Sequence, residues 1–239
     1  MLLLLSPSSG FATQQNAPPA STTGAAQPAD HPAEVAIAAD VYRYYEFIAD
    51  GFFVFRVTLG ADGQITRIRT LRDPGGSMVS VANSAIQMWK FNPAIVSGAP
   101  QPSEITVAFV YPPRVNAPAG GRFDPVIPEP RLNPSPRHNG GHRDPEHSGY
   151  APTGIISVAY AIEGYAMMST GSVVAQVSVD EEGKATSTQV LYGSAPLAGL
   201  ALEAFGKWQF QAATFNGKPV PSKVVLAYVF PLPVVVNSY

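Results

Sequence analysis

Three histidines with two neighbouring carboxylates are the residues of this chain that come nearest to a metal site. His138, His142 and His147 lie close together, with Asp144 and Glu146 between them. Imidazole nitrogens beside a carboxylate can ligate zinc or another divalent metal. Because glycines and a proline interrupt the segment, we expect no regular element to hold the rings in place. We therefore predict no metal and no cofactor, and keep these histidines as the single metal candidate.

Signatures of the common enzyme classes are missing from the sequence. There is no G-x-S-x-G elbow, no G-x-x-x-x-G-K phosphate loop and no H-E-x-x-H zinc motif. The chain has no cysteine, and all four histidines lie in expected linkers. Acid–base catalysis thus lacks its usual side chain on a rigid element. We interpret the protein as a binding protein and not an enzyme.

Four arginines could serve binding chemistry. They are Arg56, Arg67, Arg69 and Arg72, where a second copy of the same pattern has Gln176, Ser187, Gln189 and Tyr192. Clustered guanidinium groups can bind an acidic partner, a phosphate-rich surface or cell-wall material, although a solvated strand face explains them too. The formal net charge of −2 lacks the basic character typical of nucleic-acid-binding proteins, so no nucleic-acid partner is expected.

Composition divides the chain into two structured blocks and the segments around them. The blocks carry regular apolar patterns, whereas the segments between them are rich in proline and small polar residues, which is typical of linkers. The expected division is a truncated signal peptide or anchor remnant at 1–12, a disordered linker at 13–39, a first domain at 40–112, a Pro-, His- and Arg-rich linker at 113–152, a second domain at 153–233 and a tail at 234–239.

The two domains are copies of one module. Identical pairs include Gly63/Gly183, Trp89/Trp208, Phe91/Phe210, Gly98/Gly217 and Pro100/Pro219. The copies differ in length by one residue, in a Pro- and Gly-rich turn, which is a change that an ancestral duplication tolerates. The two tryptophans and their phenylalanines follow a predicted helix, and this position favours core packing. We therefore predict the same fold for both copies.

Each module is predicted to fold as strand, strand, helix and strand. Alternating apolar residues over 53–59 and 173–179 predict a first strand, and Asp62-Gly63 and Glu182-Gly183 predict the turn into a second. Apolar residues then recur at helical spacing. They are Met78, Val81, Ala82, Ala85 and Trp89, matched by Leu197, Leu200, Ala201, Ala204 and Trp208.

The helical crossover makes the second and third strands parallel, with the first strand between them. The predicted fold class is α+β, with two small ββαβ modules joined by Pro-rich linkers. Each module would have a three-stranded sheet in the order 2-1-3, packed on one helix. This order leaves the third strand of each module at an open edge.

An open edge strand offers backbone groups to which an extended peptide can add. The predicted partner-binding residues are Ser222, Val224, Val225, Ala227 and Val229 in the second copy, and Thr106, Ala108 and Val110 in the first. Three of these, Val225, Ala227 and Val229, lie on the outward face of their strand and are nevertheless apolar. A partner, the other module, a homodimer or the flanking residues 234–236 could cover them.

The segment Trp89-Lys90-Phe91-Asn92-Pro93, followed by Gly98 and Pro100, closely resembles the C-terminal domain of TonB-family energy transducers. Trp208-Gln209-Phe210, followed by Gly217 and Pro219, repeats the pattern. The resemblance implies a small periplasmic domain that lends its edge strand to an extended, TonB-box-like peptide of an outer-membrane transporter. It also implies energy transduction from the inner membrane, to which the protein would be tethered only through a missing or truncated N-terminal anchor.

These observations lead to two functional expectations. The first is an exported, periplasmic binding protein that engages extended segments of envelope or outer-membrane transport proteins by β-strand addition. The alternative is a structural or scaffolding envelope protein that forms a homodimer through its edge strands. A tight dimer that ignores peptide would favour the second.

Overall fold

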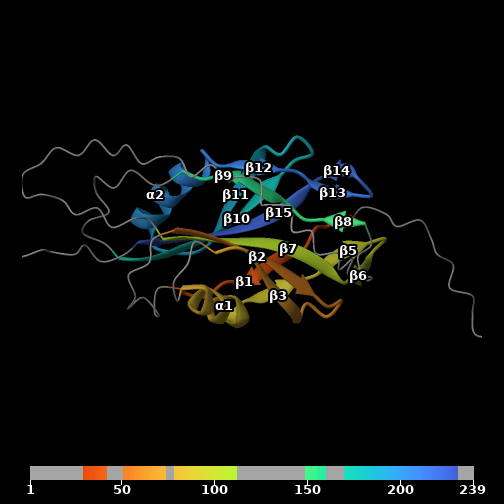
Figure 1. The fold of residues 1–239 in the computed structure, drawn as a ribbon, viewed down its shortest axis with the longest axis horizontal. Coiled ribbons are helices and arrows are strands. Elements are labelled where there is room, and N and C mark those ends of the chain that lie inside the picture. The colour runs from red at the N-terminus through yellow and green to blue at the C-terminus, as the bar shows by residue number, and fades with distance from the viewer. Residues whose placement is uncertain (1–28, 42–50, 74–77, 112–148, 160–169, 231–239) are drawn as a thin grey trace, which may run out of the picture.

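A computed structural model describes residues 29–41, 51–73, 78–111, 149–159 and 170–230. These residues form a mixed α and β structure built on one six-stranded sheet, with the strand order β11-β10-β15-β7-β2-β3 (Figure 1). The strands are β2 (Gly51–Leu59), β3 (Ile65–Arg72), β7 (Ser103–Tyr111), β10 (Gly171–Val179), β11 (Ala185–Tyr192) and β15 (Ser222–Phe230). In each half of the chain the order is second, first, third strand.

The sequence led us to expect a separate three-stranded sheet in each half. Instead, the two halves form one sheet. Neighbouring strands within each half are antiparallel, but β7 and β15 pair with each other in parallel and so join the halves into one sheet. This pairing is long-range in sequence, and no local pattern encodes it. The described residues therefore form one continuous unit.

The turn between β2 and β3 follows the predicted Asp-Gly chemistry. Gly63 has a φ of 78°, and a Cβ atom on it would lie 2.4 Å from the carbonyl oxygen of Phe91. Only glycine accommodates both the left-handed conformation and this close approach. The Asp62 side chain accepts a hydrogen bond from the backbone N–H of Gln64 at 3.0 Å, and this bond stabilises the turn.

One helix covers each face of the sheet. Helix α1 spans Met78–Met88 and helix α2 spans Ala195–Phe205, and Figure 1 shows them on opposite sides of the strands. Their buried residues are Met78, Ala82, Ala85 and Ile86 in α1, and Leu197, Ala201, Ala204 and Phe205 in α2. The predicted apolar stripes therefore do face the core. Pro196 lies in the first turn of α2, where a missing N–H costs no helical hydrogen bond.

Short strands that the sequence did not predict complete each half. They are β1 (Glu34–Ile37), β4 (Lys90–Asn92), β5 (Ala94–Val96), β6 (Ala99–Gln101), β8 (Tyr150–Ala151), β9 (Gly154–Ser157), β12 (Gln209–Gln211), β13 (Ala213–Phe215) and β14 (Lys218–Val220). β1 pairs with β4 and β9 with β12. β5 and β6 form a hairpin, as do β13 and β14, and β8 pairs with β13.

Two of these strands correct the expected domain boundaries. β1 lies in the segment predicted as the disordered linker 13–39, and β8 lies in the predicted linker 113–152. Both are too short to show a period of their own, and each is held by backbone hydrogen bonds to a strand of its own half. In each half, a strand therefore lies before the boundary that composition suggested.

The two hydrophobic cores each contain residues from both halves. The core around α2 includes Phe52, Val54, Ala108 and Val110 of the N-terminal half. The core around α1 includes Val174, Val225, Ala227 and Val229 of the C-terminal half. All eight side chains are buried, and burying a valine or phenylalanine contributes about 1.5–3 kcal/mol. The hydrophobic effect therefore holds the halves together.

No helix of the described residues is long and apolar enough to span a membrane.

Candidate protein-binding surface

The third strands, where we predicted partner binding, lie in the interior of the sheet. Backbone pairing joins them from Val224 opposite Thr106 to Tyr228 opposite Val110. The predicted binding residues Ser222, Val224, Val225, Ala227, Val229, Thr106, Ala108 and Val110 are all buried. The expectation of open edges is thus corrected, because each third strand occupies the edge of the other. A partner, the other module, a homodimer or the flanking residues 234–236 were expected to cover the apolar outer face of β15. In the structure, the other module covers it.

Polar contacts across the junction of the halves support this pairing. The Thr106 hydroxyl donates a hydrogen bond to the carbonyl oxygen of Thr153 at 2.6 Å, and the hydroxyl groups of Thr153 and Ser222 are hydrogen-bonded. On the other face, the backbone N–H of Val35 donates to the Gln176 side chain at 2.9 Å. The segment that precedes the β2–β3 hairpin therefore contacts β10 of the opposite half, and the segment that precedes the β10–β11 hairpin contacts β7.

An ion pair adds to the junction. Lys223 of β15 is bonded to Glu34 of β1, and Asn92 also donates a hydrogen bond to Glu34, at 3.1 Å. Partial burial by itself would raise the pKa of Glu34, but the hydrogen bonds from Lys223 and Asn92 and the charge of Lys223 hold it below its ordinary value. Glu34 therefore favours the joined state when it is ionised.

The two ends of the sheet are formed by the second strands. β3 ends the sheet in the N-terminal half, and β11 ends it in the C-terminal half. Most residues of both strands are exposed. Because the third strands are interior, β3 and β11 are the strands of the sheet at which a further strand could add.

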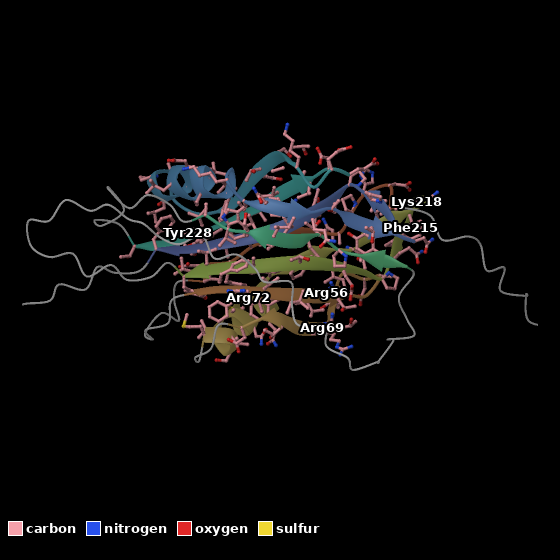
Figure 2. All side chains as sticks on the ribbon, turned by 45° about the horizontal axis from the view of Figure 1, so that its top comes forward. Arg56, Arg69, Arg72, Phe215, Lys218 and Tyr228 are labelled. Atoms are coloured by element: carbon pink, nitrogen blue, oxygen red, sulfur yellow. The ribbon has the colours of Figure 1, made fainter. Side chains whose placement is uncertain are left out.

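All four arginines of the predicted patch lie on one face of the β2–β3 hairpin. Arg67 pairs with Thr58, Arg69 with Arg56, and Arg72 with Val54. Arg67 and Arg69 share a face by ordinary alternation, and a pairing irregularity between Val54 and Phe55 brings Arg72 to the same face. Figure 2 shows Arg56, Arg69 and Arg72 along this hairpin. The structure thus places the predicted patch on one surface, the face opposite α1.

The four arginines differ in environment. The Arg56 Nε lies 3.8 Å from Glu104, and burial lowers the pKa of Arg56, with Glu104 opposing the shift and Arg69 adding to it. Arg72 lies over the Phe52 ring at 5.6 Å and donates a hydrogen bond from Nε to the Phe52 carbonyl at 3.2 Å. Arg67 and Arg69 are exposed. These two are the arginines most accessible to a partner.

The opposite end of the sheet carries no such charge. At the corresponding positions β10 and β11 have Gln176, Ser187, Gln189 and Tyr192. Gln176 is buried and accepts the hydrogen bond from Val35, a role that a guanidinium, which has no acceptor, cannot fill. The two ends of the sheet are therefore chemically different.

A groove runs beside the first part of β3. Its volume is about 940 Å³, and it is lined by residues 62–68, by Asn83 and Gln87 of α1, and by residues 88–92. Asn83 and Gln87 place the groove on the α1 side of β3, and Arg67 is also among its lining residues. A chain added along β3 would thus lie beside this groove.

Two neighbours of the arginine patch were missed at the level of sequence. Glu104 is the second residue of β7, and Tyr150 lies in a segment predicted as linker, yet both act electrostatically on Arg56. No sequence signal identifies them, because they reach Arg56 only through the pairing of β2 with β7 and the crossing of β8.

The remaining predicted residues serve structure or fall outside the description. Trp89 donates a hydrogen bond from Nε1 to the Ala39 carbonyl at 3.2 Å, and Trp208 does so to Ala159 at 3.0 Å. Both indoles are buried, as predicted for core residues. The metal candidates His138, His142 and His147 lie outside the described residues, and within those residues no three metal-ligating side chains gather.

Comparison with known proteins identifies one family. Residues 49–113 and 158–232 each match the model of the Gram-negative bacterial TonB protein C-terminal. The two matches together cover more than half of the chain, and they coincide with the two halves of the sheet. No curated protein and no solved structure was found to match.

Proposed function

Because the chain belongs to the family of the Gram-negative bacterial TonB protein C-terminal domain, we propose that it is an envelope protein that binds an extended segment of a partner protein by strand addition at β3. The observation that carries this proposal is that β3 combines an end position in the sheet with a row of arginines. Main-chain hydrogen bonds would supply affinity, and side-chain contacts would supply preference.

The position of β3 supports strand addition there and not at the third strands. A peptide could reach β7 or β15 only by breaking their mutual pairing. Breaking the pairing would expose Val225, Ala227 and Val229 on one face of the sheet. On the opposite face it would expose side chains of the N-terminal half that belong to the core around α2. A peptide of a few residues buries too little apolar surface to offset this cost. Addition at β3 breaks no pairing between described strands.

The arginine row supports an acidic partner. Arg67 and Arg69 point to the same face of β3, so alternate residues of an added strand would lie beside them. Carboxylates at every second position of the partner would therefore meet guanidinium groups, which bind carboxylates with charge-assisted hydrogen bonds. At β11 the same geometry would present Ser187 and Gln189, so we expect β11 to bind such a segment weakly.

The family supports a location and a source for the partner. We propose that the protein acts in the periplasm and that the segment belongs to an outer-membrane transport protein. Transmission of force from the inner membrane is a further step, which requires an anchor in addition to the binding described here.

The alternative function is scaffolding by edge-to-edge dimers, and the structure leaves fewer strands at which such a dimer could form. With β7 and β15 paired inside the chain, a homodimer by strand pairing would have to use β3 or β11. Analytical ultracentrifugation separates the two functions. A tight dimer that peptide does not dissociate would favour scaffolding.

Peptide titration tests the proposal directly. We expect a peptide of alternating aspartate and threonine to shift the backbone amide resonances of residues 65–72 in the ¹⁵N-labelled chain. The matched peptide with asparagine should bind about tenfold more weakly, and the difference should shrink at high salt. Shifts confined to β7 and β15, or equal binding of both peptides, would contradict the proposal.

Exchange of residues between the two ends provides a matched control. Arg67→Ser with Arg69→Gln installs the residues of β11 on β3, and should reduce binding of the aspartate peptide to that of the asparagine peptide. Ser187→Arg with Gln189→Arg makes the reverse change and should create a second site at β11. Loss of binding in the first variant without gain in the second would show that the arginines are necessary but not sufficient, and that binding also requires another feature of β3.

A further inference from the structure

The β5–β6 and β13–β14 hairpins lie together at one end of the strands. A cavity that strand addition does not use lies there. Its volume is about 660 Å³, within the range of small-molecule sites. Residues of β5, β6, β8, β13 and β14 line it, together with the end of β2 and the start of β7. Figure 1 shows both hairpins at this end of the sheet, and Figure 2 marks Phe215 there.

The walls of the cavity are mainly apolar and come from both halves. Leu59, Val96 and Pro102 belong to the N-terminal half, and Tyr150, Phe215 and Val220 to the C-terminal half. Neither half can form the cavity alone. The pairing of β7 with β15 therefore creates a site that a single module lacks.

One part of the wall is polar and negatively charged. The Glu104 carboxylate is buried there, accepts a hydrogen bond from the Thr58 hydroxyl at 3.3 Å and lies near Arg56. Tyr150 also lines the cavity. Burial, together with the charge of Glu104, raises the pKa of Tyr150 to about 12, so this hydroxyl stays protonated and can donate.

We propose that this cavity binds a neutral, single-chain amphiphile, with its apolar chain between the hairpins and its hydroxyl group beside Glu104 and Tyr150. The apolar walls favour the chain by the hydrophobic effect. A hydroxyl can accept a hydrogen bond from the phenol and donate one to the carboxylate. A carboxylate at the same place would be repelled by Glu104, so an anionic amphiphile of equal length should bind more weakly.

The test compares two probes of equal chain length on the full-length protein. We expect 1-octanol to shift the resonances of Val96, Tyr150 and Phe215, and octanoate to bind about tenfold more weakly at neutral pH. Glu104→Gln should bring the two probes within about twofold of each other, with folding checked by the thermal midpoint. Equal affinity of both probes for the wild type, or unchanged discrimination in Glu104→Gln, would overturn the proposal.

Filling the cavity supplies the control for location. Val96→Trp should abolish the octanol shifts, whereas Ile156→Trp, which adds the same indole at an exposed strand position away from the cavity, should leave them unchanged. Binding of the acidic peptide at β3 should survive Val96→Trp, so failure of this inference is distinguishable from failure of the proposed function. Octanol shifts that persist in Val96→Trp would overturn it.

Discussion

Val225 of β15 lies beside Val107 of β7, one position away from Thr106, the residue to which it corresponds in the duplicated sequence. In a sheet, residues side by side on neighbouring strands point to the same face. The shift of one residue therefore places an outward side chain of one half beside an inward side chain of the other. This is why the two helices lie on opposite faces and why each core is shared.

Val225→Asp tests the shared core. The carboxylate would lie at a fully buried position among apolar side chains, and burying an unpaired charge is strongly unfavourable. We expect the free energy of unfolding to fall by about 3 kcal/mol or more, measured by urea denaturation. Thr188→Asp on the exposed face of β11 is the control and should change stability by less than about 0.5 kcal/mol. Equal effects of the two would show that the halves are not joined through this face.

Gln176→Ala tests the contact between β1 and β10. It would leave the buried backbone N–H of Val35 without its acceptor, which costs about 1–3 kcal/mol. Gln189→Ala removes the same side chain from an exposed position of β11 and should be nearly neutral. Amide hydrogen exchange offers a second measurement, since the Val35 amide should lose protection only in the first variant.

The Glu34–Lys223 ion pair predicts a dependence of stability on pH. Since the pKa of Glu34 is lowered in the folded state, its contribution is present above the ordinary value near 4.5 and is lost as pH falls through the lowered folded-state pKa. Glu34→Gln should therefore be less stable than the wild type at neutral pH, and this difference should vanish in strong acid.

The pair of Glu203 and Lys207 on α2 is the matched control for Glu34. Both side chains are about half exposed and 3.0 Å apart, so Glu203→Gln should change stability by less than about 0.5 kcal/mol at any pH. A difference between wild type and Glu34→Gln that does not depend on pH would contradict the role assigned to this charge.

Replacement of glycine by alanine should change stability in opposite directions at Gly63 and at Gly199. Gly63→Ala would place a Cβ against the Phe91 carbonyl in a left-handed conformation, and we expect a loss of about 2 kcal/mol or more. Gly199 is exposed in the interior of α2 with open space around it, so Gly199→Ala should raise stability by about 0.5–1 kcal/mol. Thermal unfolding of both variants measures the contrast, and a stabilising effect at Gly63 would contradict the turn geometry.

Local features were predictable because their causes lie within a few residues. The Asp62-Gly63 turn follows from backbone conformation, and the buried side of α1 follows from apolar spacing at Met78, Ala82 and Ala85. The arginine row was expected on one hairpin, but the place of Arg72 on the same face depends on one pairing irregularity near the end of β3. That irregularity depends on contacts with β2, which periodicity does not reveal.

By itself, the sequence determined that the chain holds two copies of one module, that each copy has a hairpin followed by an amphipathic helix and a third strand, and that only one copy carries the arginines. Only the tertiary structure decided what the third strands do. Their apolar outer faces required burial, but composition cannot say by which surface. The other half satisfies that requirement, and so the end strands of the sheet are β3 and β11 and not β7 and β15.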